Sequence, residues 1–253
     1  MQKTASDAER LKTLRKEVDE ARAAHMKALR TYKAGDPKET IDKLWDDYIK
    51  KAGANNSDII EIVSKHPKTN SSFEALEWIV TENNRNGSQP YGNSAIELLR
   101  DNYTTNPKVG RICGFLAFYS DDWKSDLLTD FLQAVADKNP DRSTKAQALY
   151  GLGHIAYGEA ENLANTKSGD PEASFKKAEK LLKRVTKEFA NCPDLQRGRG
   201  LLSDKAGPEL YEILHLRIGK EAPEIKGRDL DGKSIKLTDY RGKVVVLDFW
   251  GNW

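Results

Sequence analysis

Signals for helix starts recur along residues 5–215, and they constrain the fold of this chain more than any other feature. Ser6-x-x-Glu9 and Ser71-x-x-Glu74 have the form of capping boxes, in which two side chains satisfy the first free N–H groups of a helix. Asp36-Pro37 and Asp170-Pro171 place an acidic cap before a proline at the first helical position. Breaks are expected at the glycines and prolines between these starts, namely Gly35, Gly53, Pro67, Gly87, Pro107, Pro140, Gly169 and Pro193. The pattern predicts at least seven helices and a mainly α-helical body.

Apolar residues repeat at helical spacing within this body. In the first segment, the spacing from Leu11 through His25 to Tyr32 alternates between three and four residues, a heptad pattern that alanine and histidine interrupt. This favours a helix lying on its neighbours over a coiled coil. His25 is then a packed residue, because no second ligand stands beside it at metal spacing. Later segments supply further core faces, with Trp45, Tyr48, Phe73, Leu76, Trp78, Ile79, Val80, Leu127, Leu128, Phe131, Leu132 and Val135.

Residues 146–157, followed by residues 175–182, resemble a degenerate tetratricopeptide helix pair. Its Leu-Gly pair at Gly153 would let two helices approach closely, and the later alanine, Ala178, would pack against it. Gly151 and Gly153 also fit a dinucleotide-binding fingerprint, but no strand precedes them, so we reject that interpretation. His154 is expected to be a packed or surface residue, because no nucleophile or carboxylate lies three or four residues away on its face.

Composition places the chain among globular proteins of mixed charge. It has 253 residues, a formal net charge of +2, 38% hydrophobic residues and 32% charged residues. No Lys/Arg block stands free of acidic neighbours, so no nucleic-acid partner is predicted. No apolar run approaches the roughly 20 residues of a membrane span, and Met1–Asp7 lacks the apolar core of a secretory signal. We find no nucleotide loop, zinc spacing or Ser/His/Asp arrangement, so neither a cofactor nor a metal is predicted.

The pattern changes from helix to strand near the C-terminus. Asp231-Gly232 predicts a two-residue hairpin loop, followed by a strand in which Ile235 and Leu237 alternate with polar residues. Val244–Trp250 is too apolar on both faces for an edge strand and predicts a central strand. Asp248 interrupts this run. Either the strand ends early and Asp248 reaches solvent, or its carboxylate is buried and has a functional role, because burial of an unpaired carboxylate is otherwise costly.

These C-terminal residues resemble the opening of a redoxin domain, as in TlpA-like and ResA-like thiol-disulfide oxidoreductases. The resemblance covers about the last 35 residues and rests on Gly219–Glu224, Gly232–Tyr240 and Asp248-Phe-Trp-x-x-Trp253. In that family the motif runs into a Cys-x-x-Cys pair, so we expect a truncated sequence that lacks the catalytic cysteines. The resemblance implies that Asp248 is a buried catalytic residue that shuttles a proton for those cysteines, although many TlpA-like proteins have asparagine there. It also implies protein thiols and disulfides as partners, and an extracytoplasmic, periplasmic location.

We therefore predict two parts, an α-helical, tetratricopeptide-like body at residues 1–215 and the first strands of a thioredoxin-like α/β domain at residues 216–253. Cys113 lies in an apolar helical stretch and Cys192 in a turn, so neither is expected to be a redox centre. Thiol-disulfide exchange is the preferred function, with the body positioning partners or dimerising. The first alternative is a helical-repeat scaffold that binds another protein. The second is a peroxiredoxin-like antioxidant protein, which is disfavoured because Trp250–Trp253 lacks the expected proline.

Overall fold

Helices account for most of the chain in the computed structural model, which describes residues 2–33, 37–81, 89–123 and 125–251. The described residues form α1 (Gln2–Thr31), α2 (Glu39–Lys65), α3 (Asn70–Thr81), α4 (Gln89–Asn102), α5 (Val109–Phe118), α6 (Ser125–Lys138), α7 (Arg142–Thr166), α8 (Glu172–Glu188) and α9 (Ser203–His215). Short elements complete the order, with the 3₁₀ turn η1 (Ser120–Asp122), the strands β1 (Lys226–Arg228) and β2 (Ser234–Lys236), and the 3₁₀ turn η2 (Leu237–Tyr240). The prediction of a mainly α-helical fold is confirmed.

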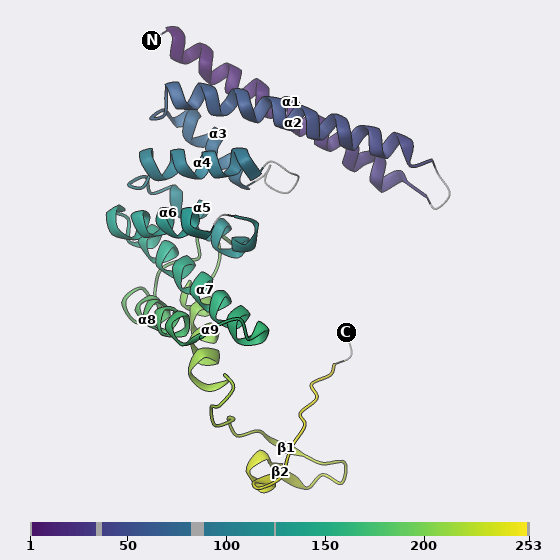
Figure 1. Ribbon diagram of the computed structural model, residues 1–253, viewed down its shortest axis with the longest axis vertical. Helices are drawn as coiled ribbons and strands as arrows, with labels where there is room; N and C mark the ends of the chain where they lie inside the picture. Colours follow the sequence, from purple (N-terminus) through teal and green to yellow (C-terminus); the bar gives the residue numbers. More distant parts are fainter. Residues whose placement is uncertain (1, 34–36, 82–88, 124, 252–253) are drawn as a thin grey trace.

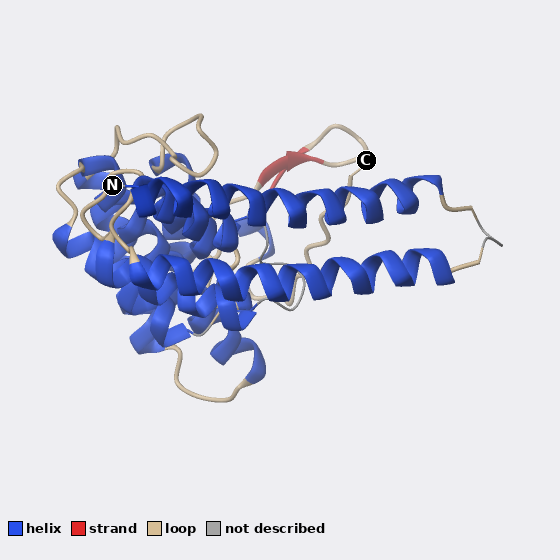
Figure 2. Ribbon diagram, turned by 90° about the horizontal axis from the view of Figure 1, so that it is seen from above, coloured by secondary structure: helices blue, strands red, loops and turns tan. Residues whose placement is uncertain are grey.

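The helices stack in chain order from one end of the molecule to the other (Figure 1). At the N-terminal end, α1 and α2 lie side by side, and their far ends project beyond the other helices (Figure 2). Further along the stack α3 packs on α4, α6 on α7, and α7 on α8. One continuous cluster of buried apolar side chains runs from Leu11 in α1 to Ile213 in α9. Each helix is therefore held mainly by its neighbours in the stack, as in helical-repeat proteins.

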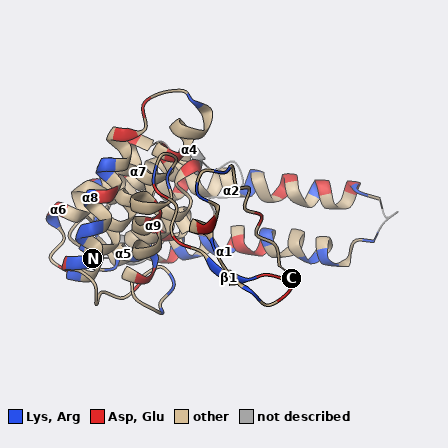
Figure 3. Ribbon diagram, turned by 90° about the horizontal axis from the view of Figure 1, so that it is seen from below, with Lys and Arg blue, Asp and Glu red and all other residues tan. Residues whose placement is uncertain are grey.

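Charges of both signs share the surface of this stack. Figure 3 shows Lys/Arg and Asp/Glu segments interspersed along α1, α2 and the body. Some ion pairs join neighbouring helices, such as Arg10 of α1 with Asp58 of α2 at 3.4 Å. Because both side chains are about half exposed, the pair adds little to stability. Within the described residues, no helix is both long enough and apolar enough to cross a bilayer.

Most predicted breaks lie between helices, and these are Pro67, Pro107, Pro140, Gly169 and Pro193. The break predicted at Gly53 is wrong, because Gly53 lies inside α2. Buried residues of α2, including Tyr48 and Ile59, continue on both sides of it. Packing of that face outweighs the roughly 1 kcal/mol that a glycine costs inside a helix. The predicted breaks at Gly35 and Gly87 and the predicted cap Asp36 lie outside the described residues.

Both predicted capping boxes are misplaced. α1 begins at Gln2, so Ser6 lies within the helix. α3 begins at Asn70, and Thr69 rather than Ser71 provides the cap, since its hydroxyl accepts the N–H of Ser72 at 3.1 Å. Four uncharged polar residues, 69–72, stand in a row at this position. Contact with another part of the chain selects among them, because Tyr103 donates its hydroxyl to the carbonyl of Thr69 at 2.8 Å.

Aspartates accept backbone N–H groups at the start of two later helices. Asp170 accepts the N–H of Glu172 at 3.0 Å, but α8 begins at Glu172, so Pro171 stands at the N-cap and not at the predicted first helical position. Asp141 accepts the N–H of Thr144 at 2.7 Å at the start of α7, a cap that the sequence analysis missed. Both follow the usual preference for a short acidic side chain before the first helical turn.

The helix pair predicted at residues 146–182 is formed by α7 and α8, which pack closely. A Cβ atom added at Gly153 would lie 3.0 Å from Leu182 Cδ2 and 3.3 Å from Leu181 Cβ. Ala178 of α8 is fully buried. Gly151 faces another neighbour, since its added Cβ would lie 3.1 Å from Ala117 Cβ. Both glycines lie inside α7, in agreement with the rejection of a dinucleotide-binding loop.

The N-terminal helix packs on its neighbours, as predicted. Leu11, Leu14 and Val18 of α1 are buried, and the carbonyl of Leu14 accepts a hydrogen bond from Asn55 Nδ2 of α2 at 2.9 Å. His25 is also buried, and its ring centroid lies 5.1 Å from that of Trp45 in α2. His25 is thus a packing residue of the α1–α2 interface.

Candidate functional site

The C-terminal segment contains the residues that resemble a redoxin site, and it extends beyond α9 at the end of the stack (Figure 1). β1 and β2 pair in antiparallel fashion, with Gly227 opposite Ile235. η2 follows directly, and Gly242 then adopts a φ of 81° that turns the chain into residues 243–250. This positive φ is the conformation in which glycine carries no steric penalty.

The hairpin loop is longer than predicted. Five residues, 229–233, separate β1 from β2, in place of the predicted two-residue loop at Asp231-Gly232. Gly232 has a φ of 78°, whereas Asp231 is not in the positive-φ region. Asp229 organises the loop, since its carboxylate accepts the N–H of Asp231 at 3.0 Å and that of Lys233 at 2.8 Å. A type I′ two-residue loop requires both central residues at positive φ, and Asp231 does not meet this condition.

Polar contacts tie the beginning of the segment to η2. The carboxylate of Glu224 accepts the Thr238 hydroxyl at 2.6 Å and the Thr238 N–H at 3.1 Å. The N–H of Leu237 donates to the carbonyl of Ile225 at 2.9 Å. The hydrogen bond from the Thr238 hydroxyl holds the pKa of Glu224 below its ordinary value. The stabilisation that the Glu224–Thr238 hydrogen bond gives to the folded segment is therefore present above the ordinary carboxyl pKa. It is lost as the pH falls through the lowered pKa of Glu224.

Val244–Trp250 does not form the predicted central strand. In the described part of the chain, β1 and β2 pair with each other and neither pairs with these residues. Val244 is 97% exposed and Val246 is 88% exposed. A central strand needs hydrogen-bond partners on both edges and cover on both faces. The described residues supply neither, so the segment is extended without being part of a sheet.

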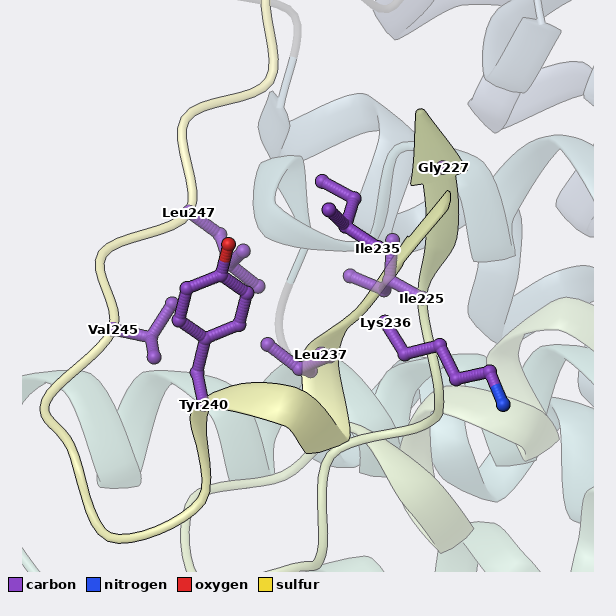
Figure 4. Close-up of a pocket in the computed structure, with 8 residues that line it drawn as sticks. All are labelled: Ile225, Gly227, Ile235, Lys236, Leu237, Tyr240, Val245 and Leu247. Carbon is purple, nitrogen blue, oxygen red and sulfur yellow. The ribbon is translucent and has the colours of Figure 1, made fainter. Parts of the chain in front are cut away.

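One face of this extended segment is partly covered. Val245 and Leu247 point toward Ile235, Leu237 and Tyr240 across an apolar hollow of about 250 Å³ (Figure 4). Val244 and Val246, which alternate with Val245 and Leu247, are almost fully exposed. Residues 244–247 therefore keep the two-residue period of a strand, with one apolar face toward the hairpin.

Asp248 is exposed, and it makes no hydrogen bond or ion pair with the described residues. The two-residue period places it on the exposed side of the segment, opposite the hollow that Leu247 lines. The burial that the resemblance implies is therefore absent in this structure, and the catalytic role of Asp248 stays a prediction. Asn252 and Trp253, which complete the Trp-x-x-Trp motif, lie outside the described residues.

Both cysteines lie in the helical body and are free thiols. Cys113 is completely buried in α5, and this burial raises its pKa above the ordinary value. Cys192 follows α8 in a loop, as predicted, but it is also buried, with Arg142 Nη1 at 3.1 Å from its Sγ. The reactive form of cysteine is the exposed thiolate. Neither residue is placed for disulfide exchange.

Comparison with known proteins agrees with the motifs of the C-terminal segment. The sequence model of the AhpC/TSA family matches residues 218–253. The chain is 55% identical over 58 residues to thiol-disulfide oxidoreductase ResA of Bacillus cereus, a match that covers 21% of this chain and 34% of that protein. It is 49% identical over 35 residues to ResA of Bacillus subtilis, covering 14% and 20% respectively. Residues 218–253 are thus similar to the TlpA/ResA-like redoxins.

A further relative, ResA of Bacillus thuringiensis, is 45% identical over 58 residues and matches along 34% of its length. The chain thus spans about a third of the length of the first relatives it matches. These relatives are named as thiol-disulfide oxidoreductases, which favours that class over the scaffold and peroxiredoxin alternatives. No solved structure matches the chain.

A polar cluster in the helical body was not predicted. Glu209 Oε1 of α9 accepts the Tyr150 hydroxyl at 2.7 Å and lies 2.9 Å from His154 Nδ1. On its own helix His154 has the Tyr150 ring stacked on it at 5.7 Å between centroids and no carboxylate three or four residues away, but it finds a carboxylate on another helix. The residues lie 55 positions apart in the sequence, so no local pattern reveals the pair. In the described part of the chain, no three His, Cys, Asp or Glu side chains are arranged to hold a metal.

Proposed function

We propose that the protein carrying this chain is a thiol-disulfide oxidoreductase whose substrates are cysteines of other proteins. The observation that carries the proposal is the 55% identity over 58 residues with ResA of Bacillus cereus. The match of the AhpC/TSA family to residues 218–253 supports it. Those residues include Asp248-Phe-Trp250, the part of the redoxin motif that precedes the cysteine pair.

Disulfide exchange requires a thiolate at neutral pH. In a Cys-x-x-Cys pair at a helix N-terminus, the helix dipole and backbone N–H groups lower the pKa of the first cysteine. Its thiolate attacks a substrate disulfide, and the second cysteine resolves the mixed disulfide after losing its proton. We assign the acceptance of that proton to Asp248. In this role the carboxylate is covered and lies within hydrogen-bond reach of the thiol whose proton it accepts.

The helical body is proposed to position the partner protein. We place its division from the redoxin segment at residue 215, where α9 ends. Arg217 still contacts the body after this point, since its Nη1 lies 3.1 Å from Glu172 Oε2 and its guanidinium lies 4.3 Å from the centre of the Phe175 ring. Packing of the body therefore extends a short way past the end of α9. The periplasmic location that the resemblance implies stays a prediction.

The gene sequence beyond codon 253 tests the class of enzyme. An in-frame Cys-x-x-Cys directly after Trp253 supports the proposal, and a stop codon at that position overturns it. The encoded protein is then assayed for reduction of insulin across neutral pH.

Asp248→Asn tests the proton acceptor in the same protein. We expect its rate to fall about 10²-fold, the usual contribution of a positioned acid–base group. Asp231→Asn is the matched control, because Asp231 is an exposed aspartate in the hairpin loop of the same segment. Equal rates for the parent and Asp248→Asn would remove the assigned role while leaving the enzyme class intact.

A further inference from the structure

Positive charge is concentrated on α8. Six of its 17 residues are Lys or Arg and three are Glu, so this helix alone carries a net charge of +3, against +2 for the whole chain. In the sequence the cations are interrupted by Glu179 and Glu188. The Lys and Arg positions of α8 are blue in Figure 3. Disulfide exchange at the redoxin segment gives this basic helix no role.

Helical periodicity separates these cations from the core. α8 packs on α7 and α9 through one apolar side, formed by Phe175, Ala178, Leu182 and Val185. Residues three and four apart lie on the same side of a helix. The cations therefore share the opposite side, which we call the outer face of α8, namely Lys176, Lys177, Lys180, Lys183, Arg184 and Lys187.

The glutamates of α8 leave most of this charge unbalanced. At about 100° per residue, Glu179 and Glu188 lie at the two edges of the outer face, where Glu179 pairs with Lys183 and Glu188 with Arg184. The third, Glu172, binds Arg217 outside the helix. Four exposed lysines have no ion pair or side-chain hydrogen bond among the described residues, namely Lys176, Lys177, Lys180 and Lys187.

Carboxylates on the elements packed against α8 do not neutralise these lysines. Those of α9 and of the loop before α8 are hydrogen-bonded to other groups, namely Asp170, Asp204, Glu209 and Glu212. On α7, Gly153 faces α8, since its added Cβ would contact Leu182. Glu159 and Glu161 of α7 are exposed, and they lie about 120° and 80° around that helix from Gly153, to either side. Neither therefore projects into the outer face of α8.

We propose that the outer face of α8 binds the surface of an anionic lipid bilayer. Clusters of four to eight Lys or Arg on a helix are typical of sites for anionic lipids, and the attraction grows with each lysine near the surface. Lysine provides a flexible point charge, which suits a layer of mobile head groups better than one fixed anion. The apolar side of α8 is buried in the body, so the helix lies on the head groups without inserting.

A protein partner fits this face less well. Protein interfaces are depleted of lysine at their centre and depend on a few aromatic or large apolar anchors. α8 exposes no large hydrophobic side chain. The outer face is therefore suited to attraction by charge alone, which is the form that binding to a lipid surface takes.

Sedimentation of the whole chain with vesicles tests the proposal. Vesicles of phosphatidylcholine with about 30% phosphatidylglycerol are compared with phosphatidylcholine alone, at about 0.1 M and about 1 M salt. We expect binding to the anionic vesicles at the lower salt and at least about tenfold weaker binding to the neutral ones. Binding should be lost at the higher salt, where the screening length falls from about 10 Å to about 3 Å.

Three results would overturn the proposal. Equal binding to neutral and anionic vesicles would assign the association to the exposed apolar residues 244–250. Binding that persists at the higher salt would show that charge does not carry it. Tighter binding of a short DNA duplex than of the anionic vesicles, at the same salt, would replace the lipid surface by a nucleic acid.

A matched pair of double variants locates the surface. Lys180→Gln/Lys187→Gln removes two unpaired lysines seven residues apart on α8, and we expect affinity for the anionic vesicles to fall about tenfold or more. The control is Lys43→Gln/Lys50→Gln, which removes the same charge from exposed lysines seven residues apart on α2, with Asp46 between them. We expect its affinity to stay within about twofold of the parent. Equal weakening by the two pairs would show that net charge, and not the outer face of α8, determines binding.

Discussion

Gly153→Ala tests whether the close approach of α7 and α8 holds the helical body together, and Gly158→Ala is its matched control. Both glycines lie inside α7, so alanine gains about 1 kcal/mol of helix propensity at each position. An added Cβ at Gly158 has nothing within 4 Å. At Gly153 it lies 3.0 Å from Cδ2 of Leu182, a residue that is fully buried.

The gain in helix propensity is the same for both variants and cancels when their free energies of unfolding are compared. The remaining difference is the cost of overpacking at Gly153. Forcing an extra methyl group into a well-packed core costs about 1–3 kcal/mol. Gly158→Ala should therefore raise the free energy of unfolding by about 1 kcal/mol. Gly153→Ala should lie about 1–3 kcal/mol below Gly158→Ala, which leaves it between parental stability and a loss of about 2 kcal/mol.

Urea unfolding followed by circular dichroism measures this difference. The free energy of unfolding is extrapolated linearly to zero denaturant, and equal slopes for the two variants show that the same surface is exposed on unfolding. If Gly153→Ala gains as much stability as Gly158→Ala, then α8 has room for the methyl group and the argument for close packing is wrong.

Three further predictions concern the C-terminal segment and the thiols. The exposed apolar residues 244–250 should make the chain associate as its concentration rises, and Asp248→Asn should strengthen this by removing the charge of that segment. Sedimentation of the parent chain, of Asp248→Asn and of the control Asp231→Asn measures this association. Equal association of the parent and Asp248→Asn would contradict the prediction. A chain ending at Gly219 should melt cooperatively and be about 1 kcal/mol more stable than one ending at His215, which lacks the Arg217 contact with Phe175. Loss of cooperative melting in the longer of these chains would show that the redoxin segment packs into the body. The 253-residue chain should reduce insulin no faster than free thiols, because both cysteines are buried. Turnover that disappears in Cys113→Ser or Cys192→Ser would refute this.

The features predicted correctly from sequence are those that depend on neighbours along the chain. Pro67 and Pro140 each stand two residues after the end of a helix, where the missing proline N–H prevents the helix from continuing. The apolar faces of α3 and α6 follow from spacing within one helix, so their large buried side chains were predicted individually, whereas the buried Ser72, Ala75 and Ala136 were not. The redoxin motif is likewise a contiguous stretch of sequence.

Tertiary contacts decided the points where those predictions failed. Gly53 was predicted to break a helix, but packing on either side of it continues α2 through that position. The cap of α3 is Thr69, to whose carbonyl Tyr103 donates from the end of α4. Val244–Trp250 has the composition of a central strand, yet a strand also needs partners for its backbone, and the described residues provide none.

The burial and pairing of charged groups depend most clearly on tertiary contacts. The apolar run around Asp248 favours a buried carboxylate, whereas the structure leaves Asp248 in solvent because no described element covers it. His154 shows the reverse, since its own helix offers no carboxylate three or four residues away and the stacking of α7 against α9 brings Glu209 to 2.9 Å from its ring. The sequence by itself determined the helical class, the redoxin resemblance and the core faces apart from Trp45, which is 36% exposed, because each depends on residues close in the chain. The tertiary structure alone decided which charged groups meet, because side chains 55 residues apart become neighbours only when the helices stack.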